Sequence, residues 1–389
     1  MVNDLGLIFR SQLPALIQLI VASLLAHALT QSDYGVFNLL KNMVIMGYAF
    51  VNFGFERTAL NLQRDYSLRT ITSNIVPIRL FIYCALIVPI VIYSDYSDIP
   101  SYLVLLALLC VAPAILDIKY SFDINQNVQQ DVALGVLRAA PLLLLYPLIL
   151  LSAEGSVLLT SHFLLLLAGY LLYVFLQHHH VPNLLGRLDF THARKYFSLS
   201  VFTFLGSVAS YINLYIPTFL IESRLGLENL ALYSVSLTLY LGFLSICALI
   251  VRISVAQYLK SDLLLKELAR CIKRLLPVWG AAVLLFAVYG KSILSLVFGA
   301  PYSASQTSLL ILLGGLAVSP VAMYFSNILI ARGLTGKYMF ISFSAAVVNI
   351  AATLLLLDRL GIASAAIGMV LSLCTLSLSG IYTIYRAGK

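Results

Sequence analysis

The chain has 389 residues, of which 61% are hydrophobic and only 10% are charged, and its mean hydropathy is +0.97. A protein of this composition cannot fold around one core that faces water, so a soluble class is excluded. The formal net charge is +8. A nucleic-acid-binding protein would need one contiguous, soluble basic face, which this chain lacks, so the charge indicates membrane topology and contact with anionic lipid.

Apolar stretches of membrane-spanning length recur twelve times along the chain. Crossing the hydrocarbon core takes about 20 mostly apolar residues in one helix. The predicted spans are 7–29, 36–57, 75–94, 101–122, 132–152, 156–177, 198–220, 229–257, 275–298, 303–331, 338–357 and 361–384. The sequence therefore predicts an all-α integral membrane protein with twelve transmembrane helices.

The basic residues set the orientation. With a cytoplasmic N-terminus, 19 of the 24 Lys and Arg residues fall in or beside the inner gaps, four fall in the outer gaps and one lies within a span. This asymmetry predicts that both termini are cytoplasmic, in the inner membrane of a bacterium. We expect a retained first span and no removable signal peptide.

The longest hydrophilic stretch divides the chain into two groups of six spans. It predicts an N-terminal lobe at 1–177, a cytoplasmic linker at 178–197 and a C-terminal lobe at 198–389. An offset of 196 residues aligns Tyr34–Phe37 with Leu230–Tyr233, and Glu56 with Arg252. This weak internal repeat predicts two pseudo-symmetric lobes around a central cavity.

Most site chemistries find no support in the sequence. The five cysteines form no CxxC pair, and His178–His180 lacks a spaced second set of ligands, so no metal and no cofactor is expected. The outer gaps are short, as at Ser94–Ser101. A membrane glycan polymerase, which would carry catalytic residues on a large outer loop, is a weak alternative, and we predict a transporter and not an enzyme.

Several short segments carry a family resemblance. Ser32–Phe37 has an acidic-Tyr-Gly-aliphatic-aromatic pattern before the second span, and Val51–Phe55 resembles its glycine-marked exit. In the second half Gly226–Ser236 resembles the corresponding entry, and further pieces follow in order as Ile293–Gly299 with Tyr302, Arg332–Lys337, Val348–Asn349 and Leu360–Ala366. In order, spacing and span count they resemble the Wzx-like flippases of O-antigen and other lipid-linked oligosaccharides, in the multidrug/oligosaccharidyl-lipid/polysaccharide exporter (MOP) superfamily.

The resemblance implies alternating access by rocking of two six-helix lobes. It implies that a polyprenyl-pyrophosphate-linked oligosaccharide is moved from the cytoplasmic to the periplasmic face for the synthesis of O-antigen, lipopolysaccharide or another surface polysaccharide. The implied partners are this substrate, membrane lipids, a polysaccharide polymerase and chain-length machinery, with no nucleic acid. Drug and metabolite cation antiporters of the same superfamily are the alternative, although the first span lacks an acidic residue after Arg10.

Cations within apolar runs are the candidate pyrophosphate contacts, because a charge in hydrocarbon is costly unless it faces water, a partner or a cavity. Arginine can hold two phosphate oxygens in its planar fork. The alternative interpretation for each of these cations is that its side chain lies along the lipid and places its charge among the lipid headgroups. The candidates are Arg10, Arg252, Arg79, Arg138 and Lys41.

Two further groups of residues complete the predicted site. Glu56 and Arg57, at the end of the second span, are the candidate inner gate, in which Glu56 pairs with Arg252; a plain helix-end carboxylate is the alternative. Asp117 and Asp123 are interpreted as solvated helix-terminal charges. The candidate sugar-contacting side chains are Tyr48, Tyr211, Tyr215 and Tyr240, although membrane interfaces and packing explain most tyrosines in such proteins.

Overall fold

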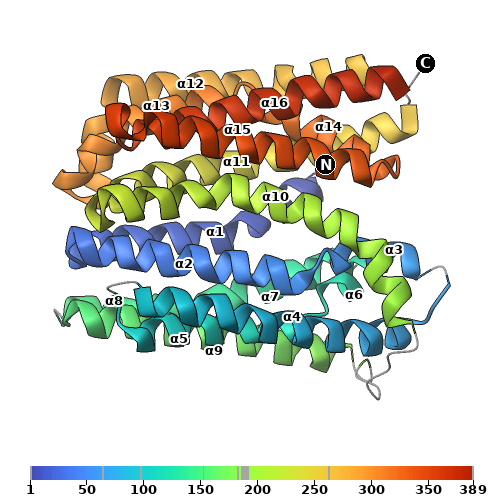
Figure 1. The fold of residues 1–389 in the computed structure, drawn as a ribbon, viewed down its shortest axis with the longest axis horizontal. Coiled ribbons are helices and arrows are strands. Elements are labelled where there is room, and N and C mark those ends of the chain that lie inside the picture. Colours follow the sequence, from blue (N-terminus) through green and yellow to red (C-terminus); the bar gives the residue numbers. More distant parts are fainter. Residues whose placement is uncertain are drawn as a thin grey trace. The chain divides into compact units, whose positions relative to one another are not determined.

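The computed structural model describes residues 2–63, 65–96, 99–125, 127–151, 153–181, 184, 192–261 and 263–387. Within these ranges every regular element is a helix and no β-strand occurs (Figure 1). The side chains of residues 2–11, and of a few further helical residues that include Arg57 and Asp123, lie outside the described ones. The all-α architecture predicted from the sequence is confirmed.

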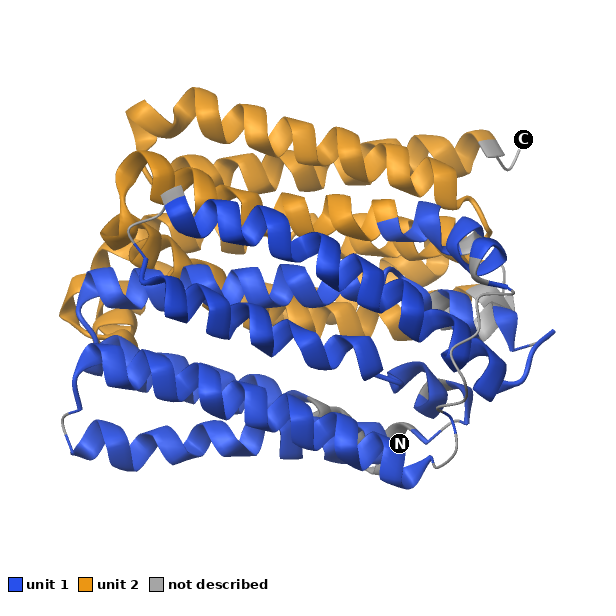
Figure 2. Cartoon of the chain, turned by 60° about the horizontal axis from the view of Figure 1, so that its bottom comes forward, with its two compact units in different colours: residues 1–204 blue, residues 205–389 orange. Residues whose placement is uncertain are grey.

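The chain forms two compact units, Met1–Phe204 (unit 1) and Leu205–Lys389 (unit 2), coloured separately in Figure 2. The division falls later than the predicted linker 178–197. The reason is that the helix Ala193–Leu225 begins with turns that pack on unit 1, where the rings of Phe197 and Phe204 stack on Phe53 at centroid distances of 4.9 and 4.0 Å. Residues 185–191 of the predicted linker lie outside the described ranges.

Unit 1 is a bundle of long helices with short connecting helices. Helix α2 packs against α4 and α5, α9 packs against α5 and α7, and α7 also packs against α1. The helices are α1 (Val2–Ala28), α2 (Gln31–Asn52), α3 (Phe55–Leu62), α4 (Leu68–Tyr96), α5 (Ser101–Val111), α6 (Lys119–Ile124), α7 (Val128–Ala139), α8 (Leu145–Leu150), α9 (Gly155–His180) and the start of α10 (Ala193–Leu225), with 3₁₀ turns at Ala112–Leu116 and Ala140–Leu144.

Local chemistry explains both ends of α2. The Thr30 side chain accepts a hydrogen bond from the backbone N–H of Asp33 at 3.1 Å and caps the N-terminus. At the other end Phe53 (φ 51°) and Gly54 (φ 71°) are left-handed, which terminates the helix. A Cβ at Gly54 would lie 3.2 Å from the backbone nitrogen of Phe204, so only glycine fits without strain. The predicted span 36–57 therefore ends early, at Asn52.

Prolines mark the interruptions of two other spans. Pro113 and Pro141 are each the second residue of a 3₁₀ turn, where the missing N–H of proline removes a helical hydrogen bond. After the first of these turns Asp117 is extended (φ −66°, ψ 122°) before α6 begins. This break decides where the Asp117 side chain lies.

The described part of unit 2 contains the later part of α10 and six further α-helices. Helix α11 packs against α12, α13 and α14, while α16 packs against α13, α14 and α15. The helices after α10 are α11 (Leu227–Ser261), α12 (Leu264–Phe298), α13 (Gln306–Gly315), α14 (Ser319–Ala331), α15 (Thr335–Leu360) and α16 (Ala363–Ala387), with a 3₁₀ turn at Ala300–Ser305. Ala300–Gly315 and Ser319–Ala331 meet at a bend of 48°.

In the described part of the chain, ten helical segments are long and apolar enough to cross a membrane, and the bent pair would make an eleventh. The first helix contributes a shorter apolar stretch, Gln12–Ala28. All twelve predicted spans thus coincide with helices. Large apolar side chains such as Phe81, Leu151 and Leu296 are 75–81% exposed, which suits contact with lipid. The chain is a multi-pass membrane protein.

Candidate functional site

Arg138 is a cation that has no charged partner among the described residues of unit 1. It lies in the last turn of α7, within the span Gln129–Leu150, and is half-buried. Its guanidinium carbon is 5.2 Å from the ring centroids of both Tyr170 and Tyr173, two residues of α9. With the residues that the structure describes, the Arg138 side chain forms no hydrogen bond and no ion pair. Its N–H groups are therefore available to an anionic group.

A third tyrosine completes the surroundings of Arg138. The ring of Tyr48, on α2, stacks on that of Tyr170 at 5.4 Å with an interplanar angle of 28°. We call Tyr48, Tyr170 and Tyr173 the tyrosine cradle. Contact with aromatic faces stabilises a cation by about 0.5–2 kcal/mol and leaves the N–H edge of a guanidinium open.

Close helix packing brings the cradle to Arg138. Gly169, on α9, faces α7, and a Cβ on Gly169 would overlap the backbone carbonyl oxygen of Arg138. The absence of a side chain at Gly169 lets the two helices approach closely. Tyr170 and Tyr173 then lie one residue and one turn further along α9, beside the guanidinium.

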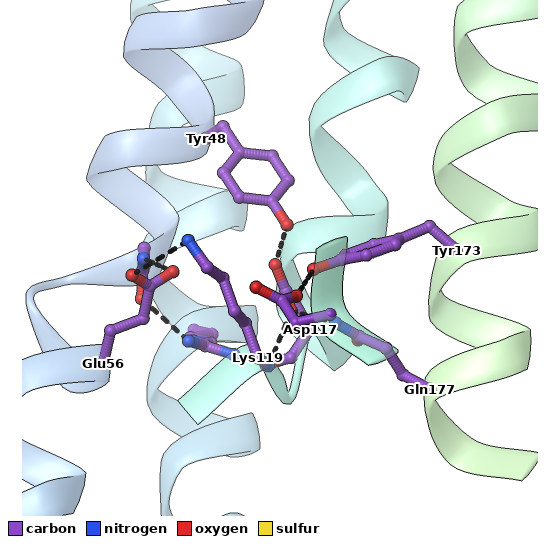
Figure 3. Close-up of polar contacts among 9 residues, drawn as sticks. Tyr48, Glu56, Asp117, Lys119, Tyr173 and Gln177 are labelled. Atoms are coloured by element: carbon purple, nitrogen blue, oxygen red, sulfur yellow. Dashed lines mark hydrogen bonds and ion pairs between the residues drawn. The ribbon is translucent and has the colours of Figure 1, made fainter. Parts of the chain in front are cut away.

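Asp117 is a buried carboxylate at the centre of a polar network (Figure 3). Tyr48 donates its hydroxyl hydrogen to Oδ2, while Gln177 Nε2 and the backbone N–H of Lys119 donate to Oδ1, each at 2.9 Å. Only 3% of Asp117 is exposed, so the expectation of a solvated helix-end charge is wrong. The extended backbone after the Pro113 turn directs the side chain into the bundle. Asp123 lies outside the described side chains.

Arg79 is an internal structural cation in this conformation. It is 2% exposed, and it donates to the Asp117 carbonyl oxygen and, at 2.8 Å, to Asn52 Oδ1. Its guanidinium carbon is 5.9 Å from the ring centroids of both Phe55 and Tyr120. The contacts thus link three segments of unit 1. A role of Arg79 in pyrophosphate binding stays a prediction.

The gate residues lie in α3, beyond the end of α2. Glu56 Oε1 accepts a hydrogen bond from Asn52 Nδ2 at 2.7 Å, and Oε2 is 3.9 Å from Lys119 Nζ. These partners come from unit 1 itself. The side chain of Arg57 lies outside the described ones, and the pairing of Glu56 with Arg252 stays a prediction.

The other predicted contacts have diverse environments. Lys41 Nζ donates to Asn38 Oδ1 at 2.8 Å and lies 5.3 Å from the ring centroid of Phe37. Arg252 is exposed on α11, and its side chain has no hydrogen bond or ion pair with the described residues. Arg10 belongs to α1, but its side chain lies outside the described ones.

The predicted sugar contacts in unit 2 are largely packed. Tyr215 is buried and stacks on Tyr211 at 6.3 Å, and Tyr240 is fully buried with its hydroxyl 3.1 Å from Ser319 Oγ. Their contact with sugar, like that of Tyr48, stays a prediction. Among the described residues no group of three or more His, Cys, Asp or Glu side chains could hold a metal ion.

Sequence reasoning missed Tyr170, Tyr173 and Gln177. A signal was present, because residues at i, i+3 and i+7 share one face of a helix. It could not be connected to Arg138 or Asp117, since nothing in the sequence shows which spans are neighbours.

Comparisons with known proteins identify the fold. No protein-family model and no curated protein sequence matches the chain. Among solved structures, the lipid II flippase MurJ in an inward closed conformation matches with a TM-score of 0.81 at 12% identity, covering 98% of this chain and 87% of that one.

Other matches are transporters of the MOP superfamily. A multidrug-resistance MATE family transporter in an outward-facing conformation has a TM-score of 0.66 at 15% identity, and a transporter from Pyrococcus furiosus, described as having a binding pocket of reversed polarity, has 0.67 at 14%. Each comparison covers 98% of this chain and 95% of the other. The chain therefore has the fold of MOP superfamily transporters.

Proposed function

We propose that this protein is a flippase that moves a polyprenyl-pyrophosphate-linked oligosaccharide from the cytoplasmic to the periplasmic face of the inner membrane by alternating access. The observation that supports this proposal most directly is the environment of Arg138. Its guanidinium lies within a membrane span and has no charged partner among the described residues. An arginine at the centre of a span is disfavoured by about 2.5–3.5 kcal/mol, so its retention with open N–H groups indicates an anionic ligand.

The ligand class follows from this chemistry. A pyrophosphate has several oxygens that can accept hydrogen bonds from the planar guanidinium of an arginine, and arginine keeps its charge when water is removed. A drug cation would be repelled by Arg138. The buried carboxylate that could attract a cation, Asp117, already accepts hydrogen bonds from three donors. The site favours an anionic cargo over a cationic one.

The fold supports the same proposal. MurJ, whose fold the chain shares, is a lipid II flippase, whereas the MATE neighbours include a multidrug-resistance transporter. We further propose that both termini are cytoplasmic, that the cargo is an O-antigen unit or another surface-polysaccharide unit, and that a polymerase and chain-length machinery use the product. Arg10, Arg252 and Lys41 are proposed as further phosphate contacts along the path.

To test this proposal, the gene is deleted in its host, and the amount of polyprenyl-pyrophosphate oligosaccharide that an impermeant probe cannot reach is measured. We expect this lipid-linked oligosaccharide to accumulate on the cytoplasmic face. The wild-type gene should abolish the accumulation, and the Arg138→Ala variant should not. Arg359→Ala is the matched control, because Arg359 also lies in the last turn of a helix but is exposed. Intact surface glycan without accumulation would overturn the flippase proposal and favour the cation antiporter.

A further inference from the structure

The buried carboxylate Asp117 belongs to the same network of side chains as the guanidinium of Arg138, yet the two groups do not pair in the structure. Tyr48 joins them, because its hydroxyl donates to Asp117 Oδ2 and its ring stacks on that of Tyr170, 5.2 Å from the guanidinium carbon of Arg138. Asp131, about two turns before Arg138 on α7, accepts a hydrogen bond from the Tyr173 hydroxyl at 3.0 Å. Buried opposite charges at short range normally form an ion pair, since each is otherwise poorly solvated. The absence of pairing requires an explanation.

The explanation lies in the donors that surround Asp117. Oδ2 accepts from the Tyr48 hydroxyl, and Oδ1 accepts from Gln177 Nε2 and the Lys119 backbone N–H. Arg79 adds a cation at the backbone carbonyl of the same residue. A carboxylate whose oxygens are satisfied by fixed donors gains little from a further partner.

The same tyrosines that satisfy the carboxylates flank Arg138. Tyr48 stacks on Tyr170, whose ring is beside the guanidinium, while Tyr173 contacts the guanidinium through its ring and Asp131 through its hydroxyl. The aromatic faces stabilise the charge without using its N–H groups.

We infer that Tyr48 is a positioning residue that caps Asp117 and thereby keeps Arg138 free to bind phosphate. Gln177 caps the second oxygen of the same carboxylate. Without the Tyr48 hydroxyl, Oδ2 of Asp117 loses its donor, and the Arg138 guanidinium becomes its best replacement. The ion pair would then compete with the ligand for Arg138. This inference rests on the proposed function, since it assumes that Arg138 binds the pyrophosphate.

The test is a double-mutant cycle on the purified full-length protein, with farnesyl pyrophosphate as the probe and its Kd as the measurement. Tyr48→Phe keeps the stacked ring and removes the hydroxyl, and we expect it to weaken binding about tenfold, the size of one charge-assisted hydrogen bond. Adding Asp117→Asn should restore most of that affinity, because the competing charge is gone. A loss of general packing could not be reversed by a second substitution.

Controls separate this inference from the proposed function. The hydroxyl of Tyr83, also in unit 1, donates a hydrogen bond to the Leu108 carbonyl oxygen at 3.3 Å. Tyr83→Phe removes this bond and should leave the Kd for farnesyl pyrophosphate unchanged. Gln177→Met removes one of the two donors to Oδ1, with the Lys119 backbone N–H remaining, and should weaken binding in the same direction as Tyr48→Phe but less strongly. This variant keeps the test open if the double variant fails to fold.

Two outcomes would overturn the inference: wild-type affinity in Tyr48→Phe and Gln177→Met, or an equal loss from Tyr48→Phe with and without Asp117→Asn. If Arg138→Ala itself leaves Kd unchanged, the proposed phosphate site fails instead. A weakened Arg138→Ala with an unaffected Tyr48→Phe would leave the proposed function standing and remove only the role of Tyr48.

Discussion

Arg79 and Arg138 lie in the same unit, but their contacts indicate different roles, one structural and one in ligand binding. Arg79 is buried and donates to Asn52 and to the backbone of Asp117, so its hydrogen bonds connect elements of the fold. Arg138 is half-buried, lies beside two tyrosine rings and forms no hydrogen bond or ion pair with the described residues. One substitution should therefore affect stability and the other affinity.

Replacing Arg79 should destabilise unit 1. Arg79→Met leaves two acceptors without their donor, and we expect the free energy of unfolding to fall by about 2–4 kcal/mol. Thermal unfolding of the purified protein measures this, with Arg69→Met as the control, because Arg69 lies on the same helix and is exposed. Equal melting temperatures for the two variants would contradict a structural role of Arg79.

The planar shape of Arg138 should matter as well as its charge. Lysine keeps the positive charge but has no flat face to lie against the rings of Tyr170 and Tyr173, and it offers no fork to phosphate. We expect Arg138→Lys to raise the Kd for farnesyl pyrophosphate about fivefold, which corresponds to the loss of a good cation–π contact. Wild-type affinity in this variant would show that a point charge suffices.

At the scale of the elements, the contact between α7 and α9 decides whether the cradle exists. Gly169 allows the close approach, and α7 ends one residue beyond Arg138, where the 3₁₀ turn that contains Pro141 begins. Helices that meet through a glycine cannot accommodate a methyl group without moving apart. Separation of α7 from α9 would carry Arg138 away from Tyr170 and Tyr173.

Gly169→Ala should therefore lower both stability and affinity. We expect a loss of about 1–3 kcal/mol in the free energy of unfolding, measured by thermal unfolding, together with weaker binding of farnesyl pyrophosphate. Gly242→Ala provides the control, because a Cβ at Gly242, in α11, meets nothing within 4 Å. There, alanine should stabilise its helix by about 0.5–1 kcal/mol. If the free energy of unfolding falls in Gly169→Ala and rises in Gly242→Ala, the loss in Gly169→Ala is due to helix packing and not to the replacement of a glycine as such.

At the scale of the whole molecule, the distribution of basic residues predicts the orientation in the membrane. Alkaline phosphatase, which is active only outside the cytoplasm, should be active when fused after Ala153 and inactive when fused after Lys389. A fluorescent protein fused after Lys389 should be bright. The physical reason is that loops rich in Lys and Arg are retained on the cytoplasmic side. The reverse pattern would place Arg57 and Lys119 at the outer face and exclude the proposed direction of transport.

The sequence by itself determined the class and the helices of this protein. Long apolar runs must form helices in lipid, because every backbone polar group needs an internal partner, so all twelve predicted spans correspond to helices. Composition also made Arg138 conspicuous, since a cation in an apolar run stands out without knowledge of its neighbours. The end of α2 was harder to predict, because Phe53 adopts the left-handed conformation that its type seldom adopts.

Only the tertiary structure decided which charges are engaged and which are open. Asp117 is buried because an interrupted span turns it inward, and its two side-chain donors come from α2 and α9, which are distant in sequence. Arg79 and Arg138 look alike along the chain, and both lie beside two aromatic rings, yet Arg79 donates hydrogen bonds to two acceptors and Arg138 donates none to the described residues. Apolar periodicity carries no information about which helices become neighbours; packing of complementary surfaces decides that, and with it the character of each buried charge.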